Sequence, residues 1–329
     1  MKTIVCLAAG CAGLMLADAS HAQNAPGGAT PSYPARQVRI IVPYPAGGPT
    51  DVMARLVAQH LTEGLGQNFF VENLTGASGV VGTGTAANSP GDGHTILFVT
   101  NDFAVAPTVS SKVPYDAVKS FAPVTIAAAS PQVVVVHPSF PAKTMRELVA
   151  VAKASPDKYN YASLGVGFGQ LSSERLFRLG LGLDVVRVPF PGASPIITST
   201  LAGHTPIAFL GLPPAAPHIK EGTLRALAVT SAKRTRVMPE VPTLLEAMPN
   251  GFDSEGWLAL AAPAGTPSAI VERIYAVLAE ALKDQAFRDA LGNDGSEIVI
   301  NSPRDFADQL ANETTKGEEL IKRVGIKLD

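Results

Sequence analysis

Cysteine is almost absent from this sequence. Cys6 and Cys11 are the only two in 329 residues, and both lie near the amino terminus. If that segment is removed, the chain has no disulfide, no thiolate nucleophile and no cysteine ligand for a metal. Charge of one sign is not in surplus either, because 26 basic residues stand against 28 acidic ones. We therefore expect no nucleic acid among its partners, and stability that comes from a large apolar core.

Long apolar runs are missing beyond the amino-terminal segment. The run from Thr3 to Ala17 follows Lys2 and is too short to span a bilayer. Small residues at Ser20 and Ala22 then predict a signal peptide over residues 1–22, with residues 23–32 as a flexible Pro/Gly/Ala-rich tether. The alternative is a lipoprotein cleavage box ending at Cys11, which would leave a very short leader.

Catalytic and cofactor motifs are also missing. The sequence has no G-x-S-x-G elbow, no H-E-x-x-H helix and no G-x-x-x-x-G-K-[ST] phosphate loop. The histidines after residue 22 are too far apart for metal-ligand spacing. A glycine pattern over 165–169 resembles a dinucleotide fingerprint, but Gln170 stands where the last glycine belongs. We therefore expect no enzyme activity, no metal and no cofactor.

What is present is an alternation of strand and helix patterns. Short β-branched runs predict strands at 38–42, 69–71, 95–100, 133–136, 159–162, 185–188, 207–210 and 224–229. Apolar residues at helical spacing predict helices at 52–61, 144–154, 171–179, 195–202 and 267–282. Thr144 and Glu147 predict a capping box, and Thr266 is expected to cap the last of these helices. This rhythm is typical of an α/β fold, and about 300 residues are enough for two lobes.

The sharpest local feature is the stretch VPYPAGGPTD over 42–51. A strand ends there, two glycines allow a tight turn, and Thr50 or Asp51 is expected to cap the next helix. Such a turn exposes backbone N–H groups at the positive end of a helix, which suits a carboxylate. A glycine turn with an ordinary N-cap explains the residues equally well. Asp51 favours the capping role, because its own charge would repel an anion.

Three more segments follow predicted strands or open helices, where a ligand could approach the backbone. These are the small-residue turn around Ser78, the pair Thr100 and Asn101, and the glycine-rich stretch 161–169. Trp257, the only tryptophan, is expected as a core aromatic, with a hinge or cleft wall as the alternative.

At these residues the chain resembles the Bug (TctC-type) solute-binding receptors of tripartite tricarboxylate transport systems. The resemblance runs from about Tyr33 to Asp329. The matching stretches are VPYPAGGPTD (42–51), VENLTGASGVVGT (71–83), PGDGHTILF (90–98), VPYDAVKSFAPVT (113–125), KYNYASLGVG (158–167), VRVPFPGASP (186–195), LRALAVTSAKR (224–234), VPTLLEA (241–247), WLALAAPAGTP (257–267) and VGIKLD (324–329).

The resemblance implies a two-lobed periplasmic-binding-protein fold of the Venus-flytrap, type II-like kind, with a parallel-rich mixed sheet flanked by helices in each lobe. Lobe 1 would comprise residues 33–130 plus 256–329 and lobe 2 residues 131–255, with strands crossing near 131–136 and 255–261. The implied function is capture of a small carboxylate in the periplasm, as a monomer, for the permease subunits of a membrane transporter. A ligand-sensing component that hands its bound form to a signalling receptor is the alternative, and a hydrolase is disfavoured by the missing motifs.

The family grips a ligand carboxylate between the loop after the first strand and the Y-A-S-x-G-x-G loop. Carried over with the neighbouring junctions, the candidate binding residues are Tyr44, Pro45, Ala46, Gly47, Gly48, Thr50, Asp51, Ser78, Thr100, Asn101, Ser163, Leu164, Gly165, Val166, Gly167, Phe168, Gly192, Ala193 and Leu210.

The second loop departs from the family pattern. Phe168, Gly169 and Gln170 stand where hydroxyl residues and a histidine are usual, and Leu210 stands in a strand that often carries polar groups. The implied wall is apolar, with Leu164 and Val166 completing it, and it would disfavour a second buried charge. We therefore expect a ligand with one well-held carboxylate and an apolar or aromatic body.

Overall fold

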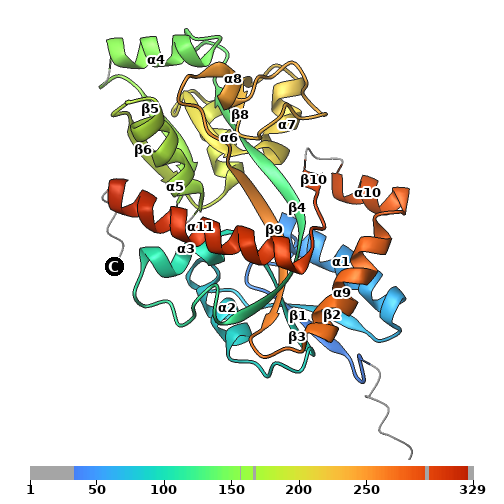
Figure 1. Cartoon of the computed structure of the whole chain (residues 1–329). Coiled ribbons are helices and arrows are strands. Elements are labelled where there is room, and N and C mark those ends of the chain that lie inside the picture. Colours follow the sequence, from blue (N-terminus) through green and yellow to red (C-terminus); the bar gives the residue numbers. More distant parts are fainter. Residues whose placement is uncertain (1–32, 156, 166–167, 293–295, 325–329) are drawn as a thin grey trace, which may run out of the picture. The chain divides into compact units, whose positions relative to one another are not determined.

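A computed structural model describes residues 33–155, 157–165, 168–292 and 296–324, and its strands form two sheets that share one strand (Figure 1). Sheet A has the order β2–β1–β3–β9–β4, and β10 pairs with the other side of β4. Sheet B has the order β8–β4–β7–β5–β6, so β4 lies between β8 and β7. The strands are β1 (Val38–Val42), β2 (Phe69–Asn73), β3 (Thr95–Thr100), β4 (Phe121–Val136), β5 (Asn160–Leu164), β6 (Val186–Phe190), β7 (Ile207–Gly211), β8 (Arg225–Val229), β9 (Glu255–Pro263) and β10 (Glu297–Ile298). The predicted signal peptide and tether lie outside the described residues.

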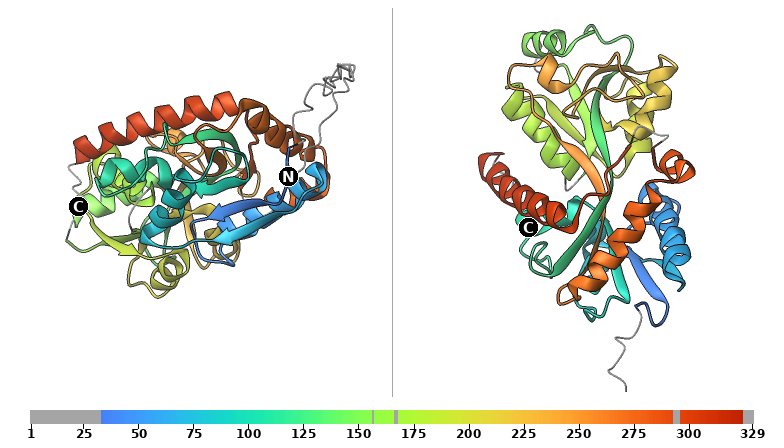
Figure 2. Two further views of the ribbon diagram at one scale, coloured as in Figure 1. Left: turned by 90° about the horizontal axis from the view of Figure 1, so that it is seen from below. Right: turned by 45° about the vertical axis from the view of Figure 1, so that its right-hand side comes forward.

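Helices cover both sheets. Those whose residues pack with sheet A are α1 (Pro49–Leu65), α2 (Val80–Ala87), α3 (Asp102–Val109), α9 (Ser268–Ala281), α10 (Gln285–Gly292) and α11 (Pro303–Val324). Those of sheet B are α4 (Met145–Ala154), α5 (Phe168–Glu174), α6 (Ala193–Leu201), α7 (Leu212–Lys220) and α8 (Leu244–Ala247). α11 contacts α3 and β4 and also reaches α5, so it packs against parts of both sheets (Figure 2).

Strand pairing is mixed, as the family resemblance implies. The pairs β1–β2, β1–β3, β5–β6 and β5–β7 are parallel, whereas β4, β9 and β10 pair antiparallel. The predicted strand 133–136 is the end of a longer one, because β4 already begins at Phe121. The second predicted crossing, near 255–261, is β9, which pairs with β3 and β4 within sheet A.

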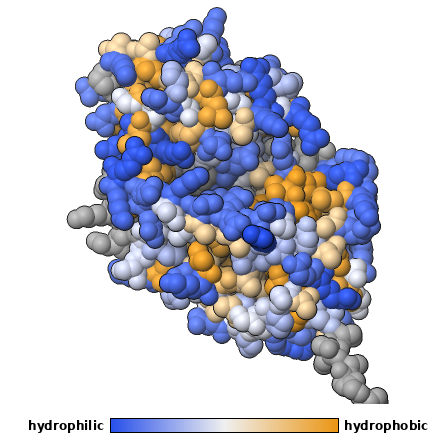
Figure 3. Space-filling model, viewed as in Figure 1, coloured by the Kyte–Doolittle hydropathy of each residue, from blue (hydrophilic) through white to orange (hydrophobic). Residues whose placement is uncertain are grey.

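The buried core consists of four apolar clusters, one on each face of each sheet. In sheet A, Ile40 and Ile41 point to opposite faces, and in sheet B, Val133 and Val134 do the same. The two clusters of sheet A use residues up to 129 or from 257 onward, and those of sheet B use residues 133–252. The core is thus divided where β4 passes between the sheets. On the outside, hydrophilic residues cover most of one face and hydrophobic ones form separate patches (Figure 3).

Trp257 is a core residue, as expected. It is 2% exposed and meets the rings of Phe103 and Phe306 edge to face. Its indole N–H lies 2.9 Å from the carboxylate of Glu313 in α11, and burial raises the pKa of that carboxyl. This contact fastens α11 to sheet A.

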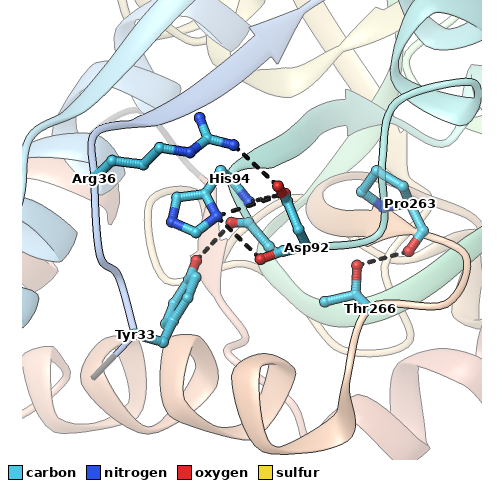
Figure 4. A network of polar contacts seen from close by, with 7 residues as sticks. Tyr33, Arg36, Asp92, His94, Pro263 and Thr266 are labelled. Carbon is cyan, nitrogen blue, oxygen red and sulfur yellow. Dashed lines mark hydrogen bonds and ion pairs between the residues drawn. The ribbon is translucent and has the colours of Figure 1, made fainter. Parts of the chain in front are cut away.

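Two predicted caps differ from the structure. The hydroxyl of Thr144 accepts a hydrogen bond from the amide of Glu147, but the carboxylate of Glu147 accepts from Lys143, so only half of the capping box forms. The prediction for Thr266 is wrong, because the N-cap of α9 is Pro267. The Thr266 hydroxyl instead donates to the carbonyl of Pro263 in the preceding turn, as Figure 4 shows.

The start of the described chain is bound to the amino ends of the sheet A strands (Figure 4). The hydroxyl of Tyr33 donates to the carbonyl of Gly93 at 2.7 Å, and Arg36 pairs with Asp92 at 2.9 Å. Asp92 also accepts from the amide of His94, next to β3. Because ligands of such sheets bind at the carboxyl ends of strands, we assign this network a structural role.

The junction of β1 and α1 is capped differently from the prediction. The N-cap of α1 is Gly48, so Thr50 and Asp51 lie inside the first turn, and no side chain caps the helix. Pro49 explains the difference, since the fixed φ of proline and its missing amide hydrogen favour the first helical position.

The Asp51 side chain holds the turn before α1 in place. It is 4% exposed, and its carboxylate accepts from the Gly47 amide at 2.8 Å, from Arg55 at 3.0 Å and from Asn73 at 2.9 Å. Asn73 also donates to the carbonyl of Tyr44. The hydrogen bond from Arg55, helped by those from Gly47 and Asn73, lowers the pKa of Asp51 to about 2.

This lowered pKa predicts a pH-dependent stability. A carboxyl whose folded pKa is depressed stabilises the fold above its unfolded pKa, and this contribution is lost as pH falls from about 4 to about 2. We expect Asp51→Asn to lower the free energy of unfolding by about 1–2 kcal/mol at pH 7, and the difference to shrink below pH 4. Urea unfolding at pH 7 and pH 2.5 measures this. Glu318→Gln, on the exposed surface of α11, controls for the lost charge. A difference that is the same at both pH values would contradict the prediction.

Two helical glycines allow a matched test of the packing next to this turn. A Cβ at Gly82 in α2 would lie 2.4 Å from the carbonyl oxygen of Leu74 and 2.9 Å from Pro43, whereas at Gly317 in α11 the nearest atom is 4.0 Å away. Both Gly→Ala changes improve helix propensity. Gly82→Ala should destabilise by about 1–3 kcal/mol through the clash, and Gly317→Ala should stabilise by up to about 1 kcal/mol. Thermal or urea unfolding distinguishes them, and equal effects would refute the packing argument.

Candidate functional site

The candidate ligand-binding residues fall into two groups at the carboxyl ends of strands, which is where ligands of α/β sheets bind. Group A follows β1 and β3 and precedes α2, and group B follows β5 and β6 and includes the end of β7. Group A comprises Tyr44, Pro45, Ala46, Gly47, Gly48, Thr50, Asp51, Ser78, Thr100 and Asn101. Group B comprises Ser163, Leu164, Gly165, Gly192, Ala193 and Leu210. Val166 and Gly167 lie outside the described residues; Phe168 opens α5, and its side chain is not described.

Tyr44 and Thr100 form one end of a short polar chain in group A. Their side-chain oxygens are 2.6 Å apart, and the Thr100 hydroxyl donates to Asp102 at 3.1 Å. Since a threonine hydroxyl has one hydrogen, Tyr44 must be the donor to Thr100. Burial and the charge of Asp102 raise the pKa of Tyr44, so its phenol stays protonated. The Tyr44 hydroxyl hydrogen is therefore engaged in the hydrogen bond to Thr100.

The turn before α2 packs directly on Tyr44. A Cβ at Gly79 would lie 3.3 Å from the tyrosine ring, and the preceding Ser78 has a φ of +54°, which is costly for a residue with a side chain. On the other side, the buried Asn101 donates to the carbonyl of Glu255 at the start of β9. Burial, and then the neighbouring carboxylates, raise the pKa of Glu255. Group A therefore lies beside the place where β9 begins.

The backbone donors of group A are fewer than the sequence suggests. The Gly47 amide donates to Asp51, and the Gly48 amide donates to Pro45 at 3.4 Å, so the glycine turn uses its own N–H groups. Among the residues that the structure describes, the second and third amides of α1, at Thr50 and Asp51, have no partner within the helix, and the N-cap Gly48 offers no side-chain acceptor for them. These amides lie at the positive end of a 17-residue helix, where an anion is stabilised.

Group B is organised by an arginine that the sequence analysis did not single out. Nη1 of Arg187 in β6 donates to the hydroxyl of Ser163 and to the carbonyls of Leu164 and Gly165, at 3.2, 3.2 and 3.1 Å. Its Nε lies 3.5 Å from the carboxylate of Glu174 in α5. The Arg187 side chain is only 19% exposed. It therefore holds three successive residues of the loop from the inside.

The residues expected to form an apolar wall differ in how far they are buried. Leu210 is 1% exposed and packs in the core with Ile196 and Leu212, so it presents almost no surface in this structure, and its place in the wall stays a prediction. Leu164 remains partly exposed. α5 begins close to it, because a Cβ at Gly169 would lie 2.8 Å from the Leu164 side chain.

Two pockets lie away from both groups. One, of about 590 Å³, is lined by residues 235–237, Leu282, Gln285, Arg288, Asp289 and 296–298. The other, of about 420 Å³, is lined by residues 143–146, 226–227, 240–242, Glu246 and Ala247. None of the candidate residues lines either pocket. Among the described residues, no cluster of His, Cys, Asp and Glu could hold a metal ion, and no helix is long and apolar enough to cross a membrane.

Known proteins resemble this chain over most of its length. The family model described as tripartite tricarboxylate transporter family receptor matches residues 53–326. Protein BugT of Bordetella pertussis is 33% identical over 299 residues, covering 90% of this chain and 92% of the relative.

Solved structures agree with the predicted α/β periplasmic-binding-protein fold. An R. palustris protein with adipate has a TM-score of 0.79 at 32% identity, covering 90% of this chain and 99% of its own. MatC from Rhodopseudomonas palustris with bound malate has a TM-score of 0.76 at 30% identity, covering 88% and 100%. The periplasmic binding protein BugD has a TM-score of 0.77 at 30% identity, covering 90% and 99%. The chain belongs to the receptor family of the tripartite tricarboxylate transporters, the Bug or TctC-type periplasmic solute-binding proteins.

Proposed function

We propose that this chain is a periplasmic receptor that captures a small organic carboxylate and delivers it to the permease subunits of a tripartite transporter. The observation that carries the proposal is the uncapped start of α1, which presents the free amides of Thr50 and Asp51 at the carboxyl edge of sheet A. Binding by these amides neutralises an anion without burying a basic side chain. The relatives solved with adipate and malate support the ligand class. The predicted signal peptide would export the chain, which then acts as a monomer.

The proposed receptor has two lobes, residues 33–130 plus 256–329 and residues 131–255. The division of the apolar core between residues 129 and 133 supports this organisation, because no buried cluster extends across it. Ligand would bind to the closed arrangement, in which groups A and B meet around it. The driving force for closure is the difference in ligand affinity between open and closed states.

The proposed ligand has one firmly held carboxylate and an apolar or aromatic body. Group A offers one set of backbone donors at α1, because the glycine amides and the Tyr44 hydroxyl are already bonded. In group B, the guanidinium of Arg187 is engaged by the loop and by Glu174. A second ligand charge would therefore have no unengaged cationic partner in these two groups, and burying it would be costly.

A ligand screen tests this function. The protein without residues 1–22 is refolded to remove bound ligand and heated with aliphatic mono-, di- and tricarboxylates, amino acids and aromatic acids. A ligand at about a hundredfold excess over Kd should add about 2.7 kcal/mol of stability, a shift of a few degrees. We expect selective stabilisation by acids with an apolar body. A preference for citrate would overturn the ligand class, and a folded protein stabilised by no carboxylate would overturn the function.

A substitution at Gly48 tests the role of the α1 amides. Gly48 has the extended backbone of an N-cap, and a Cβ there makes only an ordinary contact with Pro45. In Gly48→Asp, the carboxylate would accept from the free amides and repel a ligand carboxylate. We expect about 0.5–2 kcal/mol more stability than in Gly48→Ala, and at least tenfold weaker ligand binding by calorimetry. Equal affinity in the two variants would show that the ligand does not use these amides.

A further inference from the structure

The pocket of about 590 Å³ lies between two segments that are far apart in the sequence. One wall is residues 235–237, which follow β8 of sheet B, and the other is formed by α10 and β10, which pack with sheet A. Sites for small ligands have volumes of about 300–1,000 Å³. None of the candidate residues of groups A and B lines this pocket. It therefore offers separate room for a small molecule.

The pocket has an apolar surface to which both walls contribute. Leu282 and Ile298 are partly exposed and pack at the border of the sheet A cluster that contains Ile40. Val237, from the opposite wall, is partly exposed at the border of the sheet B cluster that contains Val133. A ligand with an apolar body would remove these side chains from water and be stabilised by their burial.

Two of the four charged residues that line the pocket have no charge partner. Arg288 and Asp289 are bonded within α10, because the Gln285 side chain accepts from Arg288 and donates to Asp289 at 2.7 Å. Arg236 and Glu297, on opposite walls, are exposed. Among the residues that the structure describes, neither side chain has a hydrogen bond or an ion pair, and the two do not pair with each other. The pocket thus presents one free cation and one free anion.

Thr235, on the same wall as Arg236, has an unmet hydrogen bond. The residue is 4% exposed, and its hydroxyl oxygen is buried without a partner in the part of the chain that the structure describes. Buried polar side chains nearly always have a partner. Rotation about the Cα–Cβ bond exchanges the hydroxyl and methyl groups of a threonine, and a ligand in the pocket is then the missing partner.

We propose that this pocket is a second binding site, for a zwitterion with an apolar body, of which an apolar α-amino acid is the simplest kind. Arg236 binds the carboxylate of this ligand, Glu297 binds its ammonium group, and the hydroxyl of Thr235 completes the polar contacts. The apolar body lies on the apolar surface between the walls. A ligand with one charge would leave one of the two charged side chains without a partner, so the carboxylate proposed for groups A and B is not the ligand of this pocket. The site does not depend on the proposed receptor function.

The test uses leucine and two analogues that each lack one charge. Leucinamide has no carboxylate, and N-acetylleucine has no ammonium group. Calorimetry on the wild-type protein, with leucine at up to about 5 mM, should show binding, and each analogue should bind about 3- to 10-fold more weakly. Absence of leucine binding at this concentration, or equal binding of the three compounds, would overturn the proposal.

Two variants assign each ligand charge to its side chain. Arg236→Gln should weaken leucine binding by about 3- to 10-fold without changing leucinamide binding, and Glu297→Gln should do the same for leucine without changing N-acetylleucine binding. Lys153→Gln in α4 and Glu318→Gln in α11 are matched controls, because both side chains are exposed and neither lines the pocket. Leucine affinities that are equal in the variants and the controls would contradict the site.

Two further substitutions separate this pocket from the other candidate site and from general stability. Gly48→Asp at the start of α1 should change leucine affinity by less than about twofold, because distant sites are independent. Loss of leucine binding in Gly48→Asp, with unchanged binding in Arg236→Gln, would place leucine in groups A and B and refute the second site. Thr235→Val should raise the melting temperature by about 1–4 °C, because it removes an unpartnered buried hydroxyl, and yet weaken leucine binding by about 2- to 5-fold. Unchanged leucine affinity in Thr235→Val would also contradict the proposal.

Discussion

The pairing of β4 is the constraint on which the other elements depend. Its first part bonds to β9 on one side and, at residues 128–129, to β10 on the other; residues 132–136 bond to β7 and residues 133–136 to β8. Because β4 has partners in both sheets, and partners on both of its sides at residues 128–129 and 133–136, it cannot shift register without breaking ladders in both sheets. Pro131, which lacks an amide hydrogen, stands between the last residue paired with β10, Ala129, and the first paired with β7, Gln132. The irregularities on either side, before Thr125 and after Val134, allow the strand to bend as it passes between the sheets.

The strands that could be predicted from the sequence are those whose own residues form an apolar, β-branched run. Val133 to Val136 are all fully buried, and their unbroken apolar run reflects a strand covered on both faces. The earlier part of β4 has one short β-branched run, Val124 to Ile126, which is flanked by alanines and prolines, so its local signal is weak and its extended form depends on its partner strands. β10, with two residues, is likewise defined only by pairing with β4. The Thr266 cap was wrong for a similar reason: its hydroxyl had a carbonyl partner in the turn before it.

The candidate loops could be found from the sequence because they directly follow predicted strands. The side chains that hold them could not, because those contacts depend on which strands are neighbours. Asn73 reaches the Asp51 turn because it is in register with Val42 across β1–β2. Arg187 reaches Ser163 because β6 lies beside β5. The i, i+4 spacing of Asp51 and Arg55 was the only sequence signal for any of these contacts.

The two loops are held by charges of opposite sign, the buried Asp51 and the partly buried Arg187, and each charge has an oppositely charged partner nearby. Asp51 accepts a hydrogen bond from the Gly47 amide and pairs with Arg55. Arg187 donates to two loop carbonyls and lies beside Glu174. The loops thereby gain rigid support, and neither charge remains for the ligand. The favourable field for an anion must then come from the backbone, chiefly the amides at the start of α1. A site built in this way recognises the position of one carboxylate by geometry, and it leaves the rest of the ligand to be selected by the apolar surface around it.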